Sequence, residues 1–194
     1  MPRLADTIFD FVQNKGVDKV FLLPGGGAMY LVDAVSKNKK IDYVAMHHEQ
    51  AAGIAAEYYA RLKDNFGVAL VTTGPGATNV ITPFVGAWIE SIPLLVISGQ
   101  VKKPDLMSKF SKLRQSGVQE VDIVSLVNNC SKYAITIKDP LKIRYELEKA
   151  YHLMMDGRKG PVWLDIPLDV QAFNIPNWSK LEKYIVPKKE DQNL

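Results

Sequence analysis

The amino-acid sequence predicts an α/β domain with a doubly wound, mainly parallel sheet and helices on both faces. Segments with strand character and segments with helix character alternate along the 194 residues. The strand segments are continuous apolar runs, which is typical of parallel strands that are covered on both sides. Glycine-rich turns follow three of these strands, at the edge of the sheet where ligands collect in this class of fold.

The first half of the chain is expected to contain four strands. Leu4, Ile8, Phe11 and Val12 recur at helical spacing and Gly16 follows as a stop, so a helix precedes the first strand. The remaining elements are strands within residues 17–27, 41–46, 66–76 and 93–100, and helices within 28–38, 48–62 and 77–91.

The second half is expected to add two strands. Residues 101–118 are polar and basic without a clear period, so we expect a loop there. After Pro167 the sequence turns irregular, and residues 187–194 are expected to form a charged, frayed tail. The elements between are a helix over 118–129, a strand over 132–137, a helix over 139–157 and a strand over 160–167.

The composition excludes several classes of function. With 47% hydrophobic and 23% charged residues and a net charge of +3, the chain is typical of a soluble globular domain. It has no basic stripe with interleaved aromatic residues, so we expect no nucleic-acid partner. No apolar run approaches the ~20 residues that span a bilayer, and the N-terminus lacks the apolar core of a signal peptide. The single cysteine, Cys130, fits a small buried residue in a reducing compartment, so we expect a cytoplasmic protein.

Stretches that are distant in sequence are expected to meet at the carboxyl edge of the sheet. In a doubly wound fold the residues that follow the parallel strands lie on one edge. Glycines there allow the backbone to approach a ligand closely, although a tight strand-to-helix turn explains Gly25–Gly27 as well. The four stretches are Pro24–Gly27, His47–Glu49, Thr73–Gly76 and Ser98–Gln100.

Glu49 is the candidate for proton chemistry at this edge. It stands between a short apolar strand and a helix, within the segment from Tyr43 to Arg61. The N-terminus of a helix favours a charged carboxylate and an apolar cleft disfavours it, so such a carboxyl can share a proton with a ring nitrogen. A carboxylate that only caps the helix explains the same position equally well.

Two histidines, His47 and His48, precede Glu49. Consecutive side chains on a strand point to opposite faces, so at most one of the two is expected to face the cleft. No cysteine or acidic partner stands at the spacing of metal ligands. We therefore expect no metal to be held by this chain.

The segment Thr72–Asn79, TTGPGATN, leaves three interpretations open. It departs from the dinucleotide fingerprint Gly-x-Gly-x-x-Gly because its third position is Asn79, and no Gly-Lys-Ser/Thr makes it a P-loop. The segment is a capped helix start, a phosphate-binding loop, or one wall of a pocket for a flat ring. In the third interpretation, which we favour, Asn79 supplies a hydrogen bond.

The helix after Glu49 is lined with small residues. They allow close approach of another backbone, either the chain's own sheet or a second subunit, and both interpretations stay open. The residues at spacings of three and four are Ala51, Ala52, Ala55, Ala56 and Tyr59.

Six segments together resemble the N-terminal, pyrimidine-binding domain of thiamine diphosphate-dependent enzymes, most like the acetolactate synthase group. They occur in the order of that family and cover roughly residues 4–171. They are VDKVFLLPGGG, HHEQAAGIAAEYYAR, TTGPGATN, ESIPLLVISGQV, VQEVDIVSLV and GPVWLDIPLDVQ.

The resemblance implies a role for Glu49. It matches the glutamate that hydrogen-bonds the N1′ nitrogen of the cofactor's aminopyrimidine and so promotes loss of the thiazolium C2 proton. The implied activity is decarboxylation or carboligation of 2-keto acids, with the cofactor supplying the carbanion chemistry. The implied cofactor contacts are Pro24, Gly25, Gly26, Pro75 and Asn79, and Gln119 matches a glutamine that faces the substrate.

Some residues on the substrate side depart from the family pattern. His47 stands where the acetolactate synthases usually have arginine, Glu90 replaces an aspartate, and Val118 replaces a phenylalanine. The loop over 101–118 is also longer than theirs. Acetolactate synthesis and a related lyase or decarboxylase reaction therefore both stay open.

Enzymes of this family continue with a middle domain and a diphosphate-binding domain. The latter holds Mg²⁺ through a Gly-Asp-Gly motif, which this sequence lacks. The resemblance implies an active site shared with the diphosphate domain of a partner subunit, a homodimer through pyrimidine domains, and FAD as an open question for the middle domain. We therefore expect an excised domain, rather than one chain of a split enzyme, that is inactive alone.

Residues 1–175 are expected to form the domain and residues 176–194 the start of an interdomain linker. Two other functions stay as alternatives. The Gly74-x-Gly76 pattern suggests a nucleotide- or dinucleotide-binding module, and the alanine-lined helix suggests a non-catalytic dimerisation domain.

Overall fold

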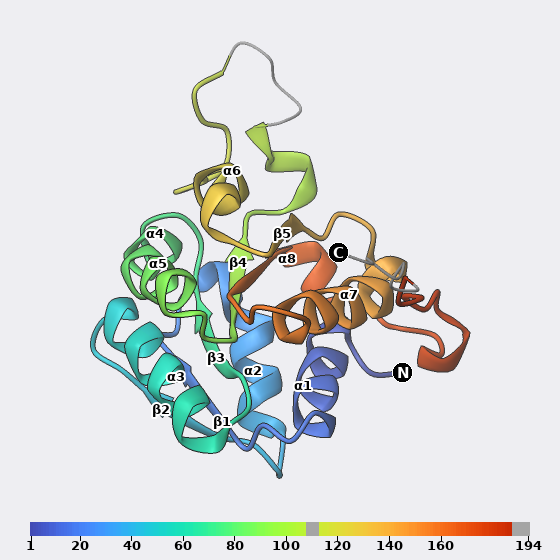
Figure 1. The fold of residues 1–194 in the computed structure, drawn as a ribbon. Helices are drawn as coiled ribbons and strands as arrows, with labels where there is room; N and C mark the ends of the chain where they lie inside the picture. Colours follow the sequence, from blue (N-terminus) through green and yellow to red (C-terminus); the bar gives the residue numbers. More distant parts are fainter. Residues whose placement is uncertain (108–112, 188–194) are drawn as a thin grey trace.

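A six-stranded sheet forms the centre of the computed structural model, which describes residues 1–107 and 113–187. Every strand pairing is parallel, and the strand order is β2-β1-β3-β4-β6-β5 (Figure 1). This arrangement confirms the predicted fold class. The strands are β1 Lys19–Leu22, β2 Asp42–Ala45, β3 Gly67–Val71, β4 Leu94–Gln100, β5 Tyr133–Thr136 and β6 Val162–Pro167.

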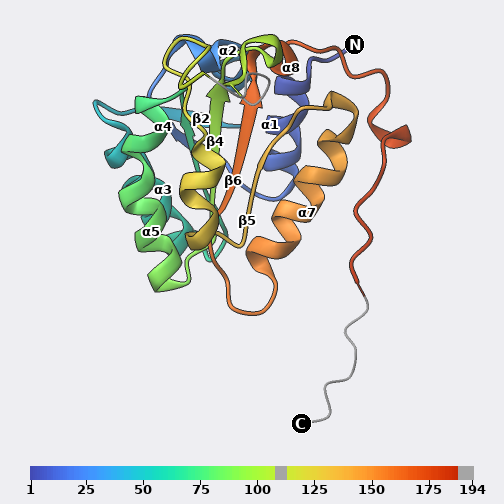
Figure 2. The ribbon, with the colours of Figure 1, turned by 90° about the horizontal axis from the view of Figure 1, so that it is seen from above.

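Helices cover both faces of the sheet (Figure 2). Helices α1, α2, α7 and α8 contribute to one buried apolar cluster, and α3 to α6 contribute to a second cluster on the opposite face. Short 3₁₀ turns occupy 26–28, 103–105, 128–130, 140–142 and 178–180. The helices are α1 Leu4–Asn14, α2 Met29–Lys37, α3 Glu49–Lys63, α4 Pro75–Asn79, α5 Ile81–Glu90, α6 Ile123–Val127, α7 Ile143–Met155 and α8 Leu168–Gln171.

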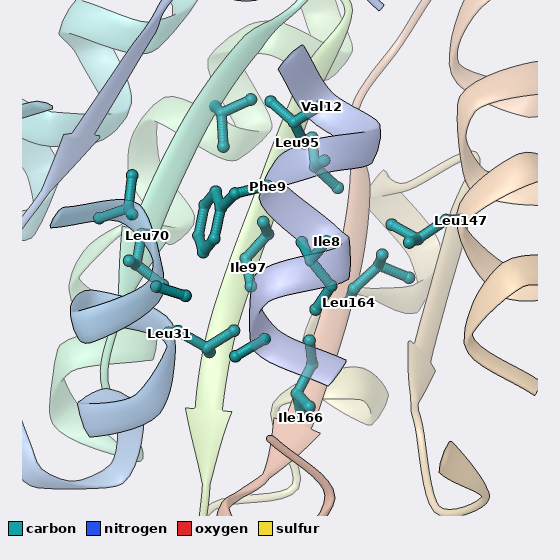
Figure 3. Close-up of a cluster of buried hydrophobic side chains, with 14 of the residues drawn as sticks. Ile8, Phe9, Val12, Leu31, Leu70, Leu95, Ile97, Leu147, Leu164 and Ile166 are labelled. Carbon is teal, nitrogen blue, oxygen red and sulfur yellow. The ribbon is translucent and has the colours of Figure 1, made fainter. Parts of the chain in front are cut away.

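The larger apolar cluster lies between the sheet and α1, α2 and α7 (Figure 3). Ile8 and Phe9 of α1 are fully buried there, against a set that includes Leu70 of β3 and Ile97 of β4. Burying a side chain of this size stabilises a fold by about 1.5–3 kcal/mol. The helical spacing of the apolar residues thus fixes which side of α1 faces the sheet.

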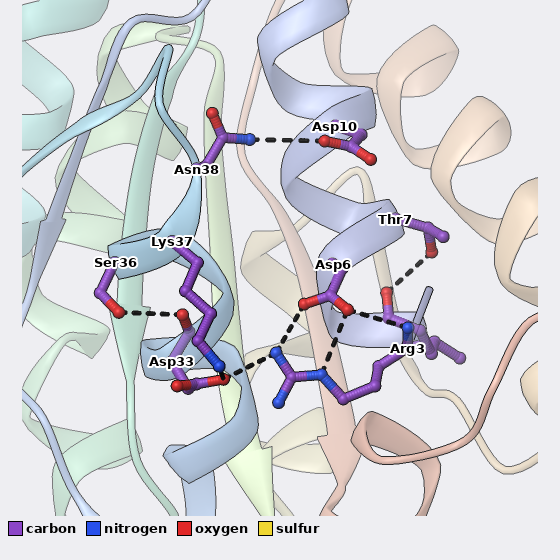
Figure 4. A network of polar contacts seen from close by, with 9 residues as sticks. Arg3, Asp6, Thr7, Asp10, Asp33, Ser36, Lys37 and Asn38 are labelled. Carbon is purple, nitrogen blue, oxygen red and sulfur yellow. Dashed lines mark hydrogen bonds and ion pairs between the residues drawn. The ribbon is translucent and has the colours of Figure 1, made fainter. Parts of the chain in front are cut away.

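Charged residues join the start of α1 to α2 (Figure 4). The Arg3 guanidinium lies 2.6 Å from Asp6 Oδ1 and 2.7 Å from Asp33 Oδ2. In the same first turn, the Thr7 hydroxyl donates to the Leu4 carbonyl at 2.8 Å. These contacts hold α2 in place directly after the glycine turn that ends β1.

The expectation that every strand is covered on both faces is wrong for β2. This strand lies at the edge of the sheet, and Asp42, Tyr43 and Ala45 are exposed. Tyr43 keeps 51% of its surface exposed. The apolar character of this segment therefore does not reflect burial within the chain.

The single helix predicted over 77–91 is wrong, because the structure has two. Helix α4 ends at Asn79, α5 begins at Ile81, and Val80 between them has φ −90° and ψ 0°. Pro83 has no backbone N–H to donate to the Asn79 carbonyl, so the helical hydrogen-bond ladder is interrupted at this point. The break leaves Asn79 at the end of a separate short helix.

The helix predicted over 118–129 is also wrong in its extent. Helix α6 starts only at Ile123, because the Asp122 carboxylate accepts a hydrogen bond from the Ser125 N–H at 3.2 Å and caps the helix there. Upstream, Gln119 has φ +57° and belongs to a turn. Within the loop predicted over 101–118, residues 108–112 lie outside the described part of the chain.

The chain after β6 is more ordered than the sequence predicts. Helix α8 follows β6 without a break. Beyond it, the centroid of the Trp178 ring lies 6.3 Å from the centroid of the Phe11 ring. The centroid of the Tyr184 ring lies 5.5 Å from that of Tyr145 in α7. Of the predicted frayed tail, residues 188–194 lie outside the described residues.

Candidate cofactor-binding site

The carboxyl ends of the parallel strands surround a cleft of about 440 Å³. It lies beside the point where the strand order reverses, since β1 pairs with β2 on one side and with β3 on the other. Ligands bind at such points in open α/β sheets. The lining residues are Gly25, Gly26, Gly27, Thr72, Thr73, Gln100, Val101, Lys102, Asp105, Val118, Gln119 and Leu168.

Glu49 is the first residue of α3 and is only 6% exposed. The preceding residue, His48, caps the helix, because its Nδ1 accepts a hydrogen bond from the Gln50 N–H at 3.1 Å. The positive end of the helix dipole therefore lies at the Glu49 carboxylate and favours its negative charge. The cap is thus made by His48, and Glu49 is not needed for that purpose.

Asn79 binds directly to Glu49. Its side-chain Nδ2 donates to Glu49 Oε2 at 2.9 Å, across 30 residues of sequence. The last residue of α4 is thereby joined to the first residue of α3. This contact holds the carboxylate in one orientation by a charge-assisted hydrogen bond.

Gly76 lets α4 approach Glu49 closely. A Cβ atom at this position would lie 2.6 Å from Thr72 Cγ2 and 3.1 Å from Glu49 Oε1. Pro75 precedes it as an exposed residue in the first turn of α4. The segment therefore packs its backbone, rather than a side chain, against the carboxylate.

Thr72 connects this carboxylate region to the glycine turn after β1. Its Oγ1 accepts a hydrogen bond from the Gly27 N–H at 3.1 Å. A Cβ atom at Gly25 would lie 2.5 Å from Thr72 Cβ, and one at Gly27 would lie 1.8 Å from Thr73 Oγ1. Gly25 and Gly27 are therefore required by close packing, whereas a Cβ at Gly26 would meet no atom within 4 Å.

Gln119 reaches the cleft from a separate turn. A Cβ at Gly74, which has φ +63°, would lie 1.9 Å from the Gln119 carbonyl oxygen, so this turn packs directly on the end of β3. Gln100 anchors the backbone just after this turn, because its Nε2 donates a hydrogen bond to the Val121 carbonyl at 3.0 Å. The side chain of Gln119 is exposed and lines the cleft.

The structure places the predicted site residues in two connected groups. Gly25, Gly26 and Gln119 line the cleft, and Pro24 is an exposed residue beside Gly25. The second group is formed by Glu49 and Asn79 with the adjacent Pro75 and Gly76, and Thr72 contacts both groups.

The histidines and the cysteine do not extend the site. His47 and His48 are both exposed, and no cluster of three or more potential metal ligands occurs within residues 1–107 and 113–187. Partial burial raises the pKa of the Cys130 thiol. In the same described ranges, no helix is long and apolar enough to cross a membrane.

Sequence reasoning missed two fully buried polar residues in or shortly after the last strand, Asp165 in β6 and Gln171 in α8. Burial raises the pKa of the Asp165 carboxyl to about 7, opposed by hydrogen bonds from Ser98, Gln100 and Thr136. The Ser98 bond is 2.6 Å and the Gln100 bond is 3.2 Å. The available signal was a lone aspartate within the apolar strand VWLDIP. Because Gln100 also holds the Val121 carbonyl, this network links β6 to the turn that carries Gln119.

Comparison with known proteins identifies relatives of the chain. Residues 2–126 match the family described as "Thiamine pyrophosphate enzyme, N-terminal TPP binding domain". The chain is 37% identical over 168 residues to the mitochondrial acetolactate synthase catalytic subunit of Saccharomyces cerevisiae, covering 87% of this chain and 23% of that protein. It is 34% identical over 177 residues to the chloroplastic acetolactate synthase of Arabidopsis thaliana, covering 91% and 25%.

A bacterial relative is similar to the chain over nearly the same length. The chain is 36% identical over 167 residues to the acetolactate synthase large subunit of Corynebacterium glutamicum, covering 86% of this chain and 26% of that protein. The chain therefore spans about a quarter of the length of these curated relatives.

Proposed function

Because the chain belongs to the thiamine pyrophosphate enzymes, as their N-terminal TPP-binding domain, we propose that Glu49 holds the aminopyrimidine ring of thiamine diphosphate. The observation that carries this proposal is the placement of the Glu49 carboxyl. It is 6% exposed, lies at the N-terminus of α3, and receives a hydrogen bond from Asn79 on Oε2 alone. Its other oxygen, Oε1, is bonded to no described residue and can bind a ring nitrogen.

The residues around Glu49 fit a flat heterocycle. Gly76 presents backbone beside Oε1, and Gly25 and Gly26 line the adjacent cleft. We assign the cofactor contacts to these residues together with Pro24, Pro75 and Asn79. When bound, thiamine diphosphate supplies a thiazolium that stabilises a carbanion. Glu49 holds or releases a proton at its carboxyl, and a site shielded from bulk water strengthens that interaction.

The proposed reaction is decarboxylation or carboligation of a 2-keto acid by a complete enzyme of the acetolactate synthase type, a transferase or lyase. The names of the relatives and the exposed Gln119 in the cleft support this assignment. The family membership does not favour the alternative of a nucleotide-binding module or a non-catalytic dimerisation domain. We propose that the complete enzyme is cytoplasmic.

The complete enzyme is proposed to be a homodimer through pyrimidine domains. Helix α3 turns its small residues Ala52, Ala56 and Ala60 inward, where they are buried. Its outer face carries Ile54, Tyr58 and Leu62, which are 42%, 58% and 87% exposed. An apolar stripe of this kind on one helix face fits contact with a second subunit.

Other parts of the complete enzyme supply what this chain lacks. We propose that a diphosphate-binding domain of the partner subunit holds Mg²⁺, and that FAD, if bound, contacts a middle domain. The domain boundary is proposed near residue 175, with the linker starting at 176.

Replacing Glu49 by glutamine in the complete enzyme tests the proposal. Glu49→Gln keeps the size of the side chain but removes its acid–base function, so turnover of 2-keto acids is expected to fall at least ~100-fold. The matched control is Glu57→Gln on the same helix, because Glu57 is similarly buried at 7% exposure but pairs with Arg61 instead. Turnover by Glu49→Gln equal to that of the control would reject the assignment.

A further inference from the structure

Gln171, the last residue of α8, lies beneath the glycine turn. It is fully buried, with 0% of its surface exposed. Its Nε2 donates to the Gly27 carbonyl at 2.7 Å and to the Ile166 carbonyl at 2.7 Å. The first of these bonds joins residues 144 positions apart, so the end of the domain reaches back to the loop after β1.

The side-chain oxygen of Gln171, Oε1, accepts no hydrogen bond from a described residue. Among the described residues, Oε1 is the one buried side-chain polar atom without a hydrogen bond. An unsatisfied buried acceptor destabilises a fold, and such a group in a native structure calls for an explanation. An apolar side chain would fill this space without that penalty. The two bonds made by Nε2 supply a reason for glutamine here.

Those bonds complete a set of contacts that hold the peptide groups on both sides of Gly27. The Gly27 N–H donates to Thr72 Oγ1 at 3.1 Å, and the Ala28 N–H donates to the Gly25 carbonyl at 3.0 Å. The Gly27 carbonyl also packs on Gly99, where a Cβ would lie 2.1 Å from it. Gln171 is the side chain that holds this carbonyl in its orientation.

We propose that Gln171 is a positioning residue that sets the geometry of the Gly25–Gly27 turn for binding thiamine diphosphate. Gly25 and Gly26 line the cleft, while Gln171 itself lies below the turn and is not among the lining residues. The proposal rests on the cofactor assignment made above. It predicts that Gln171 acts on the cofactor only through the glycine turn.

The test compares two variants of the complete enzyme. Gln171→Met keeps an unbranched side chain of similar length and removes both hydrogen bonds. The control is Thr7→Val, which removes one buried hydrogen bond in α1, a helix that contributes no residue to the lining of the cleft. Amide hydrogen exchange at Gly27 and Ala28 reports the turn, and titration with thiamine diphosphate and Mg²⁺ reports binding.

We expect Gln171→Met to speed exchange of these two amides at least ~10-fold and to raise the dissociation constant of thiamine diphosphate at least ~10-fold. Thr7→Val is expected to change neither. Unchanged exchange and affinity in Gln171→Met, or equal changes in both variants, would overturn the proposal. If Gln171→Met does not fold, Gln171→Leu, which also lacks the donor but introduces no charge, replaces it in the same comparison. Absence of cofactor binding by the wild-type enzyme would instead overturn the proposed function, while the exchange measurement still decides the role of Gln171.

Discussion

The amide of Asn79 donates a hydrogen bond to the carboxylate of Glu49 at 2.9 Å. The two residues sit at facing helix ends, Asn79 as the last residue of α4 and Glu49 as the first residue of α3. This contact occupies Oε2 of the carboxyl group and leaves Oε1 without a bond to a described residue.

Replacing Asn79 by alanine is therefore expected to weaken cofactor binding. A hydrogen bond to a charged group contributes about 1.5–3 kcal/mol, so the dissociation constant of thiamine diphosphate is expected to rise roughly 10- to 100-fold. Calorimetric titration of the complete enzyme measures it. Thr78→Ala is the control, because the Thr78 hydroxyl bonds the Pro75 carbonyl within α4. Equal affinity in both variants would show that Asn79 has no role in binding.

Replacing Gly76 by alanine is expected to displace α4 from Glu49. The added Cβ would lie 2.6 Å from Thr72 Cγ2, and overpacking of this kind costs about 1–3 kcal/mol. Urea denaturation should show that loss, together with weaker cofactor binding. Gly86→Ala in α5 is the control, since its Cβ would meet its nearest neighbour, Glu57, at 3.7 Å. A Gly76→Ala protein as stable as this control would contradict the packing described here.

The Asp165 carboxyl is expected to make stability depend on pH. Burial raises its pKa from 3.8 to about 7, so between these values the folded protein keeps a proton that the unfolded chain has lost. The free energy of unfolding should therefore fall as the pH rises from about 4 to 7, by roughly 4 kcal/mol at most at ~1.4 kcal/mol per pKa unit.

Asp165→Asn imitates the neutral carboxyl and should remove this slope. Denaturant unfolding at several pH values compares it with the wild type and with Asp42→Asn, whose carboxyl is 85% exposed. The Asp42 variant is expected to keep the wild-type slope. A wild-type slope in Asp165→Asn would show that another group is responsible.

The proposed homodimer predicts an effect of a charge on the outer face of α3. Tyr58→Glu introduces a carboxylate on a side chain that is 58% exposed, and desolvating it in an interface would be unfavourable. Sedimentation velocity of the complete enzyme should then show more monomer. Leu141→Glu, 46% exposed and away from α3, is the control. An unchanged dimer in Tyr58→Glu would place the interface elsewhere.

Apolar spacing located the buried faces of helices but not the residues at which two of the helices begin or end. The helix spacing of Leu4, Ile8 and Val12 predicts the buried face of α1 correctly, because that pattern is local. The break at Val80 was missed because an apolar helical pattern continues through it, while Pro83 interrupts the hydrogen bonds. The late start of α6 was missed because Asp122 is an ordinary polar residue until its carboxylate caps the helix.

The sequence by itself determined the parallel α/β fold and the glycine turns at one edge of its sheet, and it selected Glu49 as the candidate residue. These conclusions follow from apolar periodicity, turn residues and motifs, which neighbouring positions specify. Only the tertiary structure decided that Asn79 bonds Glu49, that Thr72 lies between the glycine turn and Gly76, and that Gln171 supports Gly27. The bond of Asn79 to Glu49 joins residues 30 positions apart and that of Gln171 to Gly27 joins residues 144 positions apart, and the partners are selected by how the helices pack on the sheet.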